Sequence, residues 1–395
     1  MRASSERTRR MDAPMALILM TVVIDLIGFG IVLPILPLWA QHFGASATEI
    51  GLLSASYSLM QVIFAPMWGR LSDRVGRRPV ILITLVGSCA SAFMLGIAHT
   101  LLILFLARIL NGISGASYAA AQAYVADITT NESRARGMGL IGAAFGIGFI
   151  IGPAIGAGLS LISPATPFFF ASGLAGLNLV LAWRLLPESR KPGSLVAPSG
   201  RFAMMRHALT GRELGPLVWL SFVATFAFVG MEATFALLGS HRFGYGPSTV
   251  AMLFAFVGLA AALGQGVLVG RLVARYGETR VMVWGLAGTA AGLALLAAAF
   301  NVLVVLLALL ILGVFSGLAF ATLSALISHA APVDAQGGVL GVAASTSGLA
   351  RVGGPILAGA LFQYIDPSAP LVLGAVLTAL CVLVATRSVL RPAAA

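Results

Sequence analysis

Charged residues are scarce in this chain. Asp, Glu, Lys and Arg together make up 9% of its 395 residues, whereas a soluble domain carries roughly a quarter. Apolar residues account for 59% of the chain, and its mean hydropathy is +1.00. Because a water-exposed surface cannot be built from so few charges, the composition excludes a soluble globular protein and indicates a surface in contact with lipid.

Cysteine and histidine are also rare. Cys89 and Cys381 lie in apolar runs, which excludes a disulfide framework, and the five histidines show no metal-ligand spacing. Glycine-rich stretches such as "GFGIVLP" lack the strand-to-helix context and the lysine of a phosphate-binding loop. We therefore expect no metal, no cofactor and no enzymatic site, and an energy source other than ATP.

Long apolar runs are what the chain has in abundance. About 20 apolar residues are needed to cross the hydrocarbon core as a helix. Polar breaks and Gly or Pro residues divide the chain into twelve such runs, and the sequence therefore predicts an all-α membrane protein. The predicted spans are 14–39, 48–70, 79–98, 100–126, 137–160, 166–186, 216–239, 247–272, 280–299, 302–328, 338–363 and 368–388.

The basic residues are distributed asymmetrically about these spans. The formal net charge is +11, but the arginines and the single lysine, Lys191, fall almost entirely on one side, and the opposite side carries only Arg242. By the positive-inside rule, both termini are predicted to be cytoplasmic. The basicity thus reflects membrane topology, which argues against a nucleic-acid partner.

A polar connection and an internal repeat divide the chain in two. We expect an N-terminal six-helix bundle over 1–190, a cytoplasmic linker over 191–214 and a C-terminal six-helix bundle over 215–395. "GRLSDRVG" beginning at Gly69 aligns with "GRLVARYG" beginning at Gly270, and "GFIIGPAIGAG" aligns with "RVGGPILAGAL". Both alignments have nearly the same offset, which indicates a duplicated unit with a pseudo-twofold axis along the membrane normal.

Several motifs resemble those of one transporter family. "GRLSDRVGRRP" is similar to the loop between helices 2 and 3 of the major facilitator superfamily, and "LARILNGISGA" resembles its helix-4 arginine motif. "GIGFIIGPAIGA" resembles the helix-5 motif of its drug/proton antiporters. "DLIGFGIVLPILP", "YVADIT", "ESRARGMG" and "LLPES" look most like the twelve-helix tetracycline/proton antiporters and their multidrug relatives.

The resemblance implies proton-coupled efflux of amphipathic drugs or other small molecules by alternating access. It also implies a location in the bacterial inner membrane, where a monomer would use protons and no cofactor. Proton-coupled uptake of a small metabolite by the same fold stays open as the alternative. A channel or a sensor is less well supported, because neither would use the gate motif and the moving helix interface that the resemblance implies.

The charged loop at 69–79 is predicted to be a gate. In the family, Asp73 would contact the start of the helix at 338–363, and Arg77 would pair with Asp127, which closes the cytoplasmic side. Arg74 and Gly76 belong to the same motif, with glycine permitting a sharp turn. The second copy has Ala274 in place of Asp73, so this contact is expected in one half only.

The fifth predicted span carries a ridge of small residues. Gly148, Gly152 and Gly156 recur at four-residue spacing, beside Pro153. Such spacing is typical of close helix packing. We expect this ridge to form a rocking interface against the span at 247–272.

Apart from the charges at the span ends, four charged residues lie inside the predicted spans, where each is costly and needs a cavity or a partner: Asp25, Arg108, Glu232 and Arg351. Asp25 lies roughly 16 Å from the inner end of its helix, and we expect it to be the principal proton carrier, tuned by Arg108. Glu232 is the rival carrier, although it could instead lie at the outer mouth. A purely structural pairing of Arg108 also stays open.

Polar and aromatic residues indicate a substrate cavity. Arg108 begins a polar helix face, and a second face lies on the span at 48–70. The candidate cavity residues are Tyr57, Gln61, Asn111, Tyr118, Gln122, Phe145, Phe235 and Arg351.

The substrate is expected to differ from that of a dedicated tetracycline pump. The tetracycline pumps that the chain resembles carry a histidine in helix 8 and acids in helices 3 and 9. This chain has Ala261, Ser91 and Thr289 at the aligned positions. A metal-chelated drug would lose those partners.

Overall fold

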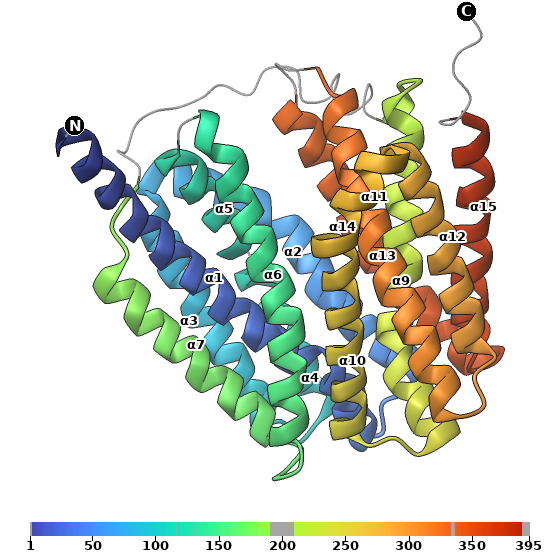
Figure 1. Ribbon diagram of the computed structural model, residues 1–395. Coiled ribbons are helices and arrows are strands. Elements are labelled where there is room, and N and C mark those ends of the chain that lie inside the picture. The colour runs from blue at the N-terminus through green and yellow to red at the C-terminus, as the bar shows by residue number, and fades with distance from the viewer. Residues whose placement is uncertain (1, 116, 130, 190–208, 333–335, 389–395) are drawn as a thin grey trace, which may run out of the picture. The chain divides into compact units, whose positions relative to one another are not determined.

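The fold is entirely helical in the described part of the chain (Figure 1). The computed structural model describes all residues except 1, 116, 130, 190–208, 333–335 and 389–395. The side chains of 2–13, 117–119, 131–136, 336–337 and 388 also lie outside that description. Most of the predicted linker and the side chain of Tyr118 are therefore outside the described residues.

The helices follow the predicted spans closely. The first part of the chain forms α1 (Arg2–His42), α2 (Ala47–Val75), α3 (Arg77–Gly96), α4 (Leu101–Ser114), α5 (Ser117–Ile128), α6 (Asn131–Leu159) and α7 (Thr166–Leu185). The second part forms α9 (Leu214–Phe243), α10 (Pro247–Ala262), the π-helical turn η1 (Leu263–Leu268), α11 (Val269–Tyr276), α12 (Glu278–Ala297), α13 (Val302–Ala330), α14 (Gln336–Tyr364) and α15 (Ala369–Ser388).

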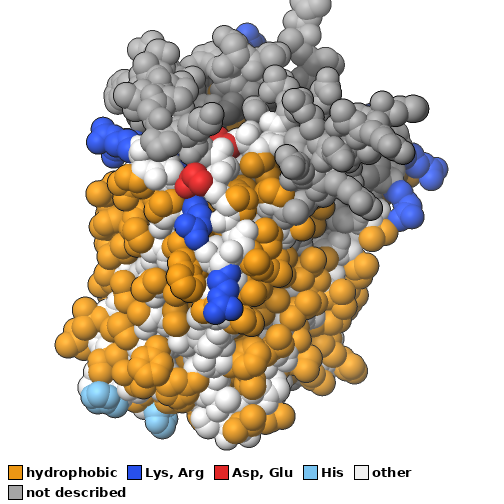
Figure 2. Space-filling view, turned by 90° about the vertical axis from the view of Figure 1, so that its left-hand side faces the viewer, with side chains coloured by type: hydrophobic (Ala, Val, Ile, Leu, Met, Phe, Trp, Pro, Cys, Tyr) orange, Lys and Arg blue, Asp and Glu red, His pale blue; other side chains and the backbone are white. Residues whose placement is uncertain are grey.

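Ten helical stretches within the described residues are long and apolar enough to cross a membrane. The two other predicted spans correspond to the pair α4 and α5, of which α4 ends at Ser114 and α5 begins at Ser117, and to α14. Glycines, a run of hydroxyl residues over 345–347 and Arg351 lower the mean hydropathy of α14. Apolar side chains cover most of the described part of the face shown in Figure 2, and the histidines there lie at the end away from the acidic residues.

The chain divides into two compact units. The first holds α1, α2 from Ser56 onwards, α3 to α7 and the segment Pro247–Ala255 of α10. The second holds Ala45–Ala55, α9, the remainder of α10 with η1 and α11, and α12 to α15. Each unit has its own apolar core. Tyr124, Ile81 and Leu85 are fully buried in the first, and Val218, Met282 and Leu286 are fully buried in the second.

Backbone details at both ends of α3 repeat at α12, at an interval of 201 residues. Gly76 precedes α3 with φ = 102°, and Gly277 precedes α12 with φ = 84°. The next helix begins at a side-chain cap in both units, where Thr100 accepts from Ile103 N and Asn301 accepts from Val304 N. A duplicated six-helix unit accounts for this agreement at the level of single residues.

The glycine ridge of α6 packs onto α1. A Cβ atom at Gly148 would lie 2.5 Å from Leu26 Cβ, and one at Gly152 would lie 2.7 Å from the carbonyl oxygen of Ile27. At Gly156 the nearest atom is Ile35 Cδ1, at 3.1 Å. The three glycines thus serve close packing inside the first unit, whereas the sequence predicted that they face the helix over 247–272. A sliding surface between the halves would need another face of α6 and stays a prediction.

Candidate functional site

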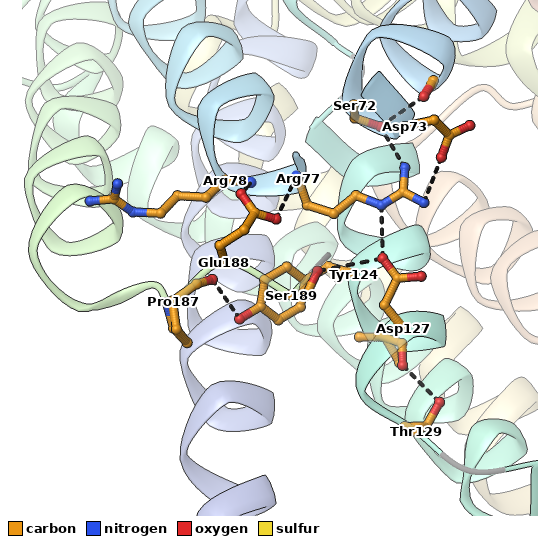
Figure 3. Close-up of polar contacts among 12 residues, drawn as sticks. Ser72, Asp73, Arg77, Arg78, Tyr124, Asp127, Thr129, Pro187, Glu188 and Ser189 are labelled. Carbon is orange, nitrogen blue, oxygen red and sulfur yellow. Dashed lines mark hydrogen bonds and ion pairs between the residues drawn. The ribbon is translucent and has the colours of Figure 1, made fainter. Parts of the chain in front are cut away.

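Arg77 lies at the centre of a polar network at the start of α3 (Figure 3). Its Nε donates to Asp127 Oδ2 of α5 at 2.9 Å, and its Nη2 donates to Asp73 Oδ1 of α2 at 2.8 Å. Its Nη1 donates to the hydroxyl of Ser72. The side chain of Arg77 is only 7% exposed, whereas those of Asp73 and Asp127 are 41% and 25% exposed.

This arrangement joins the ends of three helices through one guanidinium. Arginine suits the position because its planar group offers donors in several directions and stays charged when buried. The structure therefore brings together three of the five residues of the predicted gate. Gly76 forms the turn directly before Arg77, and Arg74 is exposed in the last turn of α2.

Glu188 is a member of the network to which the sequence assigned no role. Its carboxylate accepts from the backbone N–H of Arg77 at 2.8 Å and from that of Arg78 at 3.1 Å. A carboxylate at a helix N-terminus satisfies N–H groups that have no partner within the helix. The motif "LLPES" contains Glu188, so its position after α7 was the available signal.

The residues around Glu188 hold this segment in place. Tyr124 donates its hydroxyl to the carbonyl oxygen of Pro187 at 3.0 Å, and Ser189 donates to Asp127 Oδ2 at 3.4 Å. The segment after α7 thus contacts the same Asp127 that binds Arg77 (Figure 3). Any displacement of α7 would act on the network.

We predict that Gly76→Ala destabilises the protein more than Gly277→Ala does. Both residues combine positive φ with an extended ψ, of 161° at Gly76 and 154° at Gly277, a conformation almost confined to glycine that costs another residue about 1–3 kcal/mol. Only Gly76 faces a neighbour, because its Cβ would lie 2.4 Å from Glu188 Oε2, whereas nothing lies within 4 Å of a Cβ at Gly277. Thermal unfolding of both purified variants measures the difference, and equal losses would contradict the role of Glu188.

A second cluster surrounds Arg108 in the first unit. Arg108 of α4 is 3% exposed, and its guanidinium carbon lies 4.3 Å from the centre of the Tyr57 ring of α2. This is the geometry of a cation–π interaction. Gln61 donates to the Tyr57 hydroxyl at 3.3 Å and to the carbonyl oxygen of Gly115 at 3.1 Å. Three of the predicted site residues therefore lie together.

Aromatic rings extend this cluster along α1 and α6. The Phe29 ring lies 5.5 Å from that of Tyr57 and 6.0 Å from that of Phe149, which stacks on Phe145 at 4.7 Å. Phe29 and Phe149 were not predicted as site residues. Phe29 could have been found, because it lies four residues after Asp25 and shares its helix face.

Three other predicted site residues of the first unit lie outside the contacts described for Arg108. Asn111 donates to Ser91 Oγ at 2.9 Å, while Gln122 of α5 is half-buried. Asp25 is half-buried beside a small cavity that Thr21, Ile81 and Ala121 also line.

In the second unit, Glu232 is half-buried on α9, and Arg351 is exposed on α14. Phe235 is 3% exposed, and its place in a substrate cavity stays a prediction. The predicted contact of Asp73 with the start of α14 stays a prediction, as does any pairing of Asp25 with Arg108.

The chain is similar to known transporters over most of its length. The family model of the Major Facilitator Superfamily matches residues 18–268 and 220–395. The chain is 34% identical to "Tetracycline resistance protein, class C" of Escherichia coli, over 87% of this chain and 88% of that protein. It is 30% identical to "Multidrug resistance protein 2" of Bacillus subtilis (strain 168), over 88% of each chain.

Solved structures of transporters share the fold. The human organic anion transporter MFSD10 (TETRAN) has a TM-score of 0.72 and 25% identity, covering 95% of this chain and 99% of that one. The nucleoside transporter NupG has a TM-score of 0.79 at 12% identity, covering 96% of this chain and all of that one, which shows the fold alone. The chain belongs to the Major Facilitator Superfamily and has the twelve-helix, multi-pass architecture of its transporters.

Proposed function

We propose that this protein exports amphipathic small molecules, including drugs, across the bacterial inner membrane. The observation that carries the proposal is similarity over almost the whole chain to proteins named for tetracycline and multidrug resistance. The cluster around Arg108 supports it, because buried positive charge beside aromatic rings suits amphipathic or charged ligands.

We further propose that export is coupled to protons through Asp25. A state that closes around this carboxyl group favours its neutral form, and a state that admits water or the Arg108 guanidinium favours the carboxylate. Alternation between two such states would let Asp25 bind a proton on one side of the membrane and release it on the other. Glu232 is the alternative carrier.

The proposal also covers the membrane topology and the role of the cytoplasmic gate. Both termini lie in the cytoplasm, by the bias of arginines toward that side. Two six-helix bundles over 1–190 and 215–395, joined by the linker at 191–214, rock around the substrate site in a monomer. Asp73, Arg77 and Asp127 stabilise the state that is closed toward the cytoplasm.

Dye accumulation in cells tests the direction of transport. Cells that express the protein should accumulate less of a fluorescent cationic dye such as ethidium than control cells, and an uncoupler should abolish the difference. Greater accumulation that depends on the proton gradient would instead favour the alternative, proton-coupled uptake of a small metabolite. Equal accumulation of a broad set of dyes and drugs, at verified expression, would contradict export.

We predict that tetracycline is not the preferred substrate. Ser91 accepts a hydrogen bond from Asn111 Nδ2 at 2.9 Å, and Thr289 donates to the carbonyl oxygen of Gly285 at 2.8 Å. Both side chains are buried and neutral at positions where the resemblance places acids in tetracycline pumps. Minimal inhibitory concentrations for a panel of drugs at equal expression provide the measurement. A rise for tetracycline that far exceeds every other rise would disprove the prediction.

A further inference from the structure

A cavity of about 490 Å³ opens on the second unit, and none of the residues that form the Arg77 and Arg108 clusters lines it. It lies between the beginning of α9, the residues just before that helix and the last part of α15. The volume is within the range of ligand pockets in proteins. Its walls include Arg212, Trp219, Leu220, Val223, Cys381 and Val384.

The apolar wall of this cavity continues into the surface of α15. Trp219 is 51% exposed and Val384 is 49% exposed, although both belong to membrane-spanning helices. On α15, the neighbouring side chains of Leu380 and Leu383 are also about half exposed, at 51% and 53%. Half-exposed apolar side chains on a membrane span face hydrocarbon. The wall formed by Trp219 and Val384 therefore suits an apolar group, such as an acyl chain, of a molecule that resides in the membrane.

The rim of the cavity carries positive charge. Arg212, two residues before α9, lines the cavity and is exposed. Arg387 is exposed in the last turn of α15, three residues after Val384. The neighbouring acid, Glu213, does not line the cavity. A guanidinium binds a phosphodiester with two parallel hydrogen bonds, which makes Arg212 suited to a lipid headgroup.

We propose that this cavity is a binding site for an anionic phospholipid. One acyl chain lies against Trp219 and Val384, and the phosphate binds Arg212. With both termini in the cytoplasm, the site belongs to the inner leaflet, where anionic lipids attract basic residues near the surface. The cation at the rim favours a headgroup of net negative charge over a zwitterionic one, although both contain a phosphate.

Native mass spectrometry of the purified full-length protein tests the headgroup. The protein is supplied with equal amounts of phosphatidylglycerol or phosphatidylcholine, and the bound lipid is counted as the detergent is stripped. Wild type should retain phosphatidylglycerol in preference. Arg212→Gln should reduce that retention about tenfold, since a charge-assisted hydrogen bond is lost.

The matched control is Arg271→Gln. Arg271 of α11 is an exposed arginine of the same unit that does not line the cavity. Its Nη1 donates to the carbonyl oxygen of Val267, four residues earlier in η1, at 3.2 Å. This variant removes the same charge and should retain phosphatidylglycerol as the wild type does. Equal loss in both variants would mean that net charge alone attracts the lipid, and would overturn the proposed site.

A second pair of variants tests the acyl-chain groove. Val384→Trp places a large side chain inside the cavity without changing charge, and should release the bound lipid. Leu383→Trp adds the same side chain one position away, on a residue that does not line the cavity, and should have no effect. Equal retention of the two lipids by wild type, or retention that neither Arg212→Gln nor Val384→Trp changes, would overturn the proposal. Each readout is independent of whether the protein exports drugs.

Discussion

Replacing Asp25 by asparagine should reduce proton-driven export to the level of empty vesicles. Asparagine keeps the size of the side chain but cannot release a proton, so the cycle loses the group that we propose to carry it. In vesicles with an imposed pH gradient, the Asp25→Asn protein should transport no dye above background. Binding of the dye to the purified variant should persist, because the cluster of Arg108, Tyr57 and Gln61 stays intact.

The control for this prediction is Glu232→Gln. Glu232 is also half-buried within a membrane span, in the other unit, and the same isosteric change removes its charge. We expect this variant to retain most of its transport. Normal pumping by Asp25→Asn together with loss in Glu232→Gln would move the proton site to the second unit.

Replacing Asp73 by asparagine should impair transport strongly while leaving the protein nearly as stable. Its carboxylate is 41% exposed and bonds Arg77 at 2.8 Å, and without this charge the buried Arg77 still keeps Asp127 as a counter-charge. The proposed gate, in contrast, needs the charge in each cycle. Transport rates in vesicles and the unfolding temperature of the same preparation separate these two effects.

Asp127→Asn gives the complementary measurement. Asp127 binds the same guanidinium at 2.9 Å and is less exposed, at 25%. We expect this variant to lose both transport and stability, since Asp127 is the less exposed of the two acids that bind the buried Arg77 and also accepts a hydrogen bond from Ser189. If Asp73→Asn transports at the wild-type rate, Asp73 has no part in a gate.

Much of the fold could be predicted because lipid imposes simple rules on sequence. An apolar run of sufficient length must be helical, since no water satisfies its backbone, and this requirement fixes the spans within a few residues. The division of the fourth span into α4 and α5 had no such signal. The partner of the α6 glycines was missed because spacing shows that a ridge is smooth and cannot show which helix it contacts.

The candidate site could be predicted where a charged side chain lies inside a membrane span, because such a charge is energetically costly. Arg108 is conspicuous because a charge in a membrane span needs a partner, and Tyr57 and Gln61 share one helix face. Glu188 was harder to assign, since a carboxylate after a span resembles an ordinary loop residue. Its role depends on the turn at Gly76, which brings two backbone N–H groups to it across more than a hundred positions of sequence.

The π-helical turn η1 explains a one-residue discrepancy between the two copies. Before it, Ile50, Gly51 and Leu53 match Val250, Ala251 and Leu253 at an interval of 200, with the same sequence of buried positions. After it, Gly76 and Gly277 match at 201. The continuous helical stretch Pro247–Tyr276, which comprises α10, η1 and α11, has 30 residues, whereas the corresponding helix α2 has 29. A π turn absorbs one added residue without rotating the remainder of the helix. The second copy therefore carries one additional residue inside a membrane helix, which the local bulge at η1 accommodates while the register of the following helix is kept.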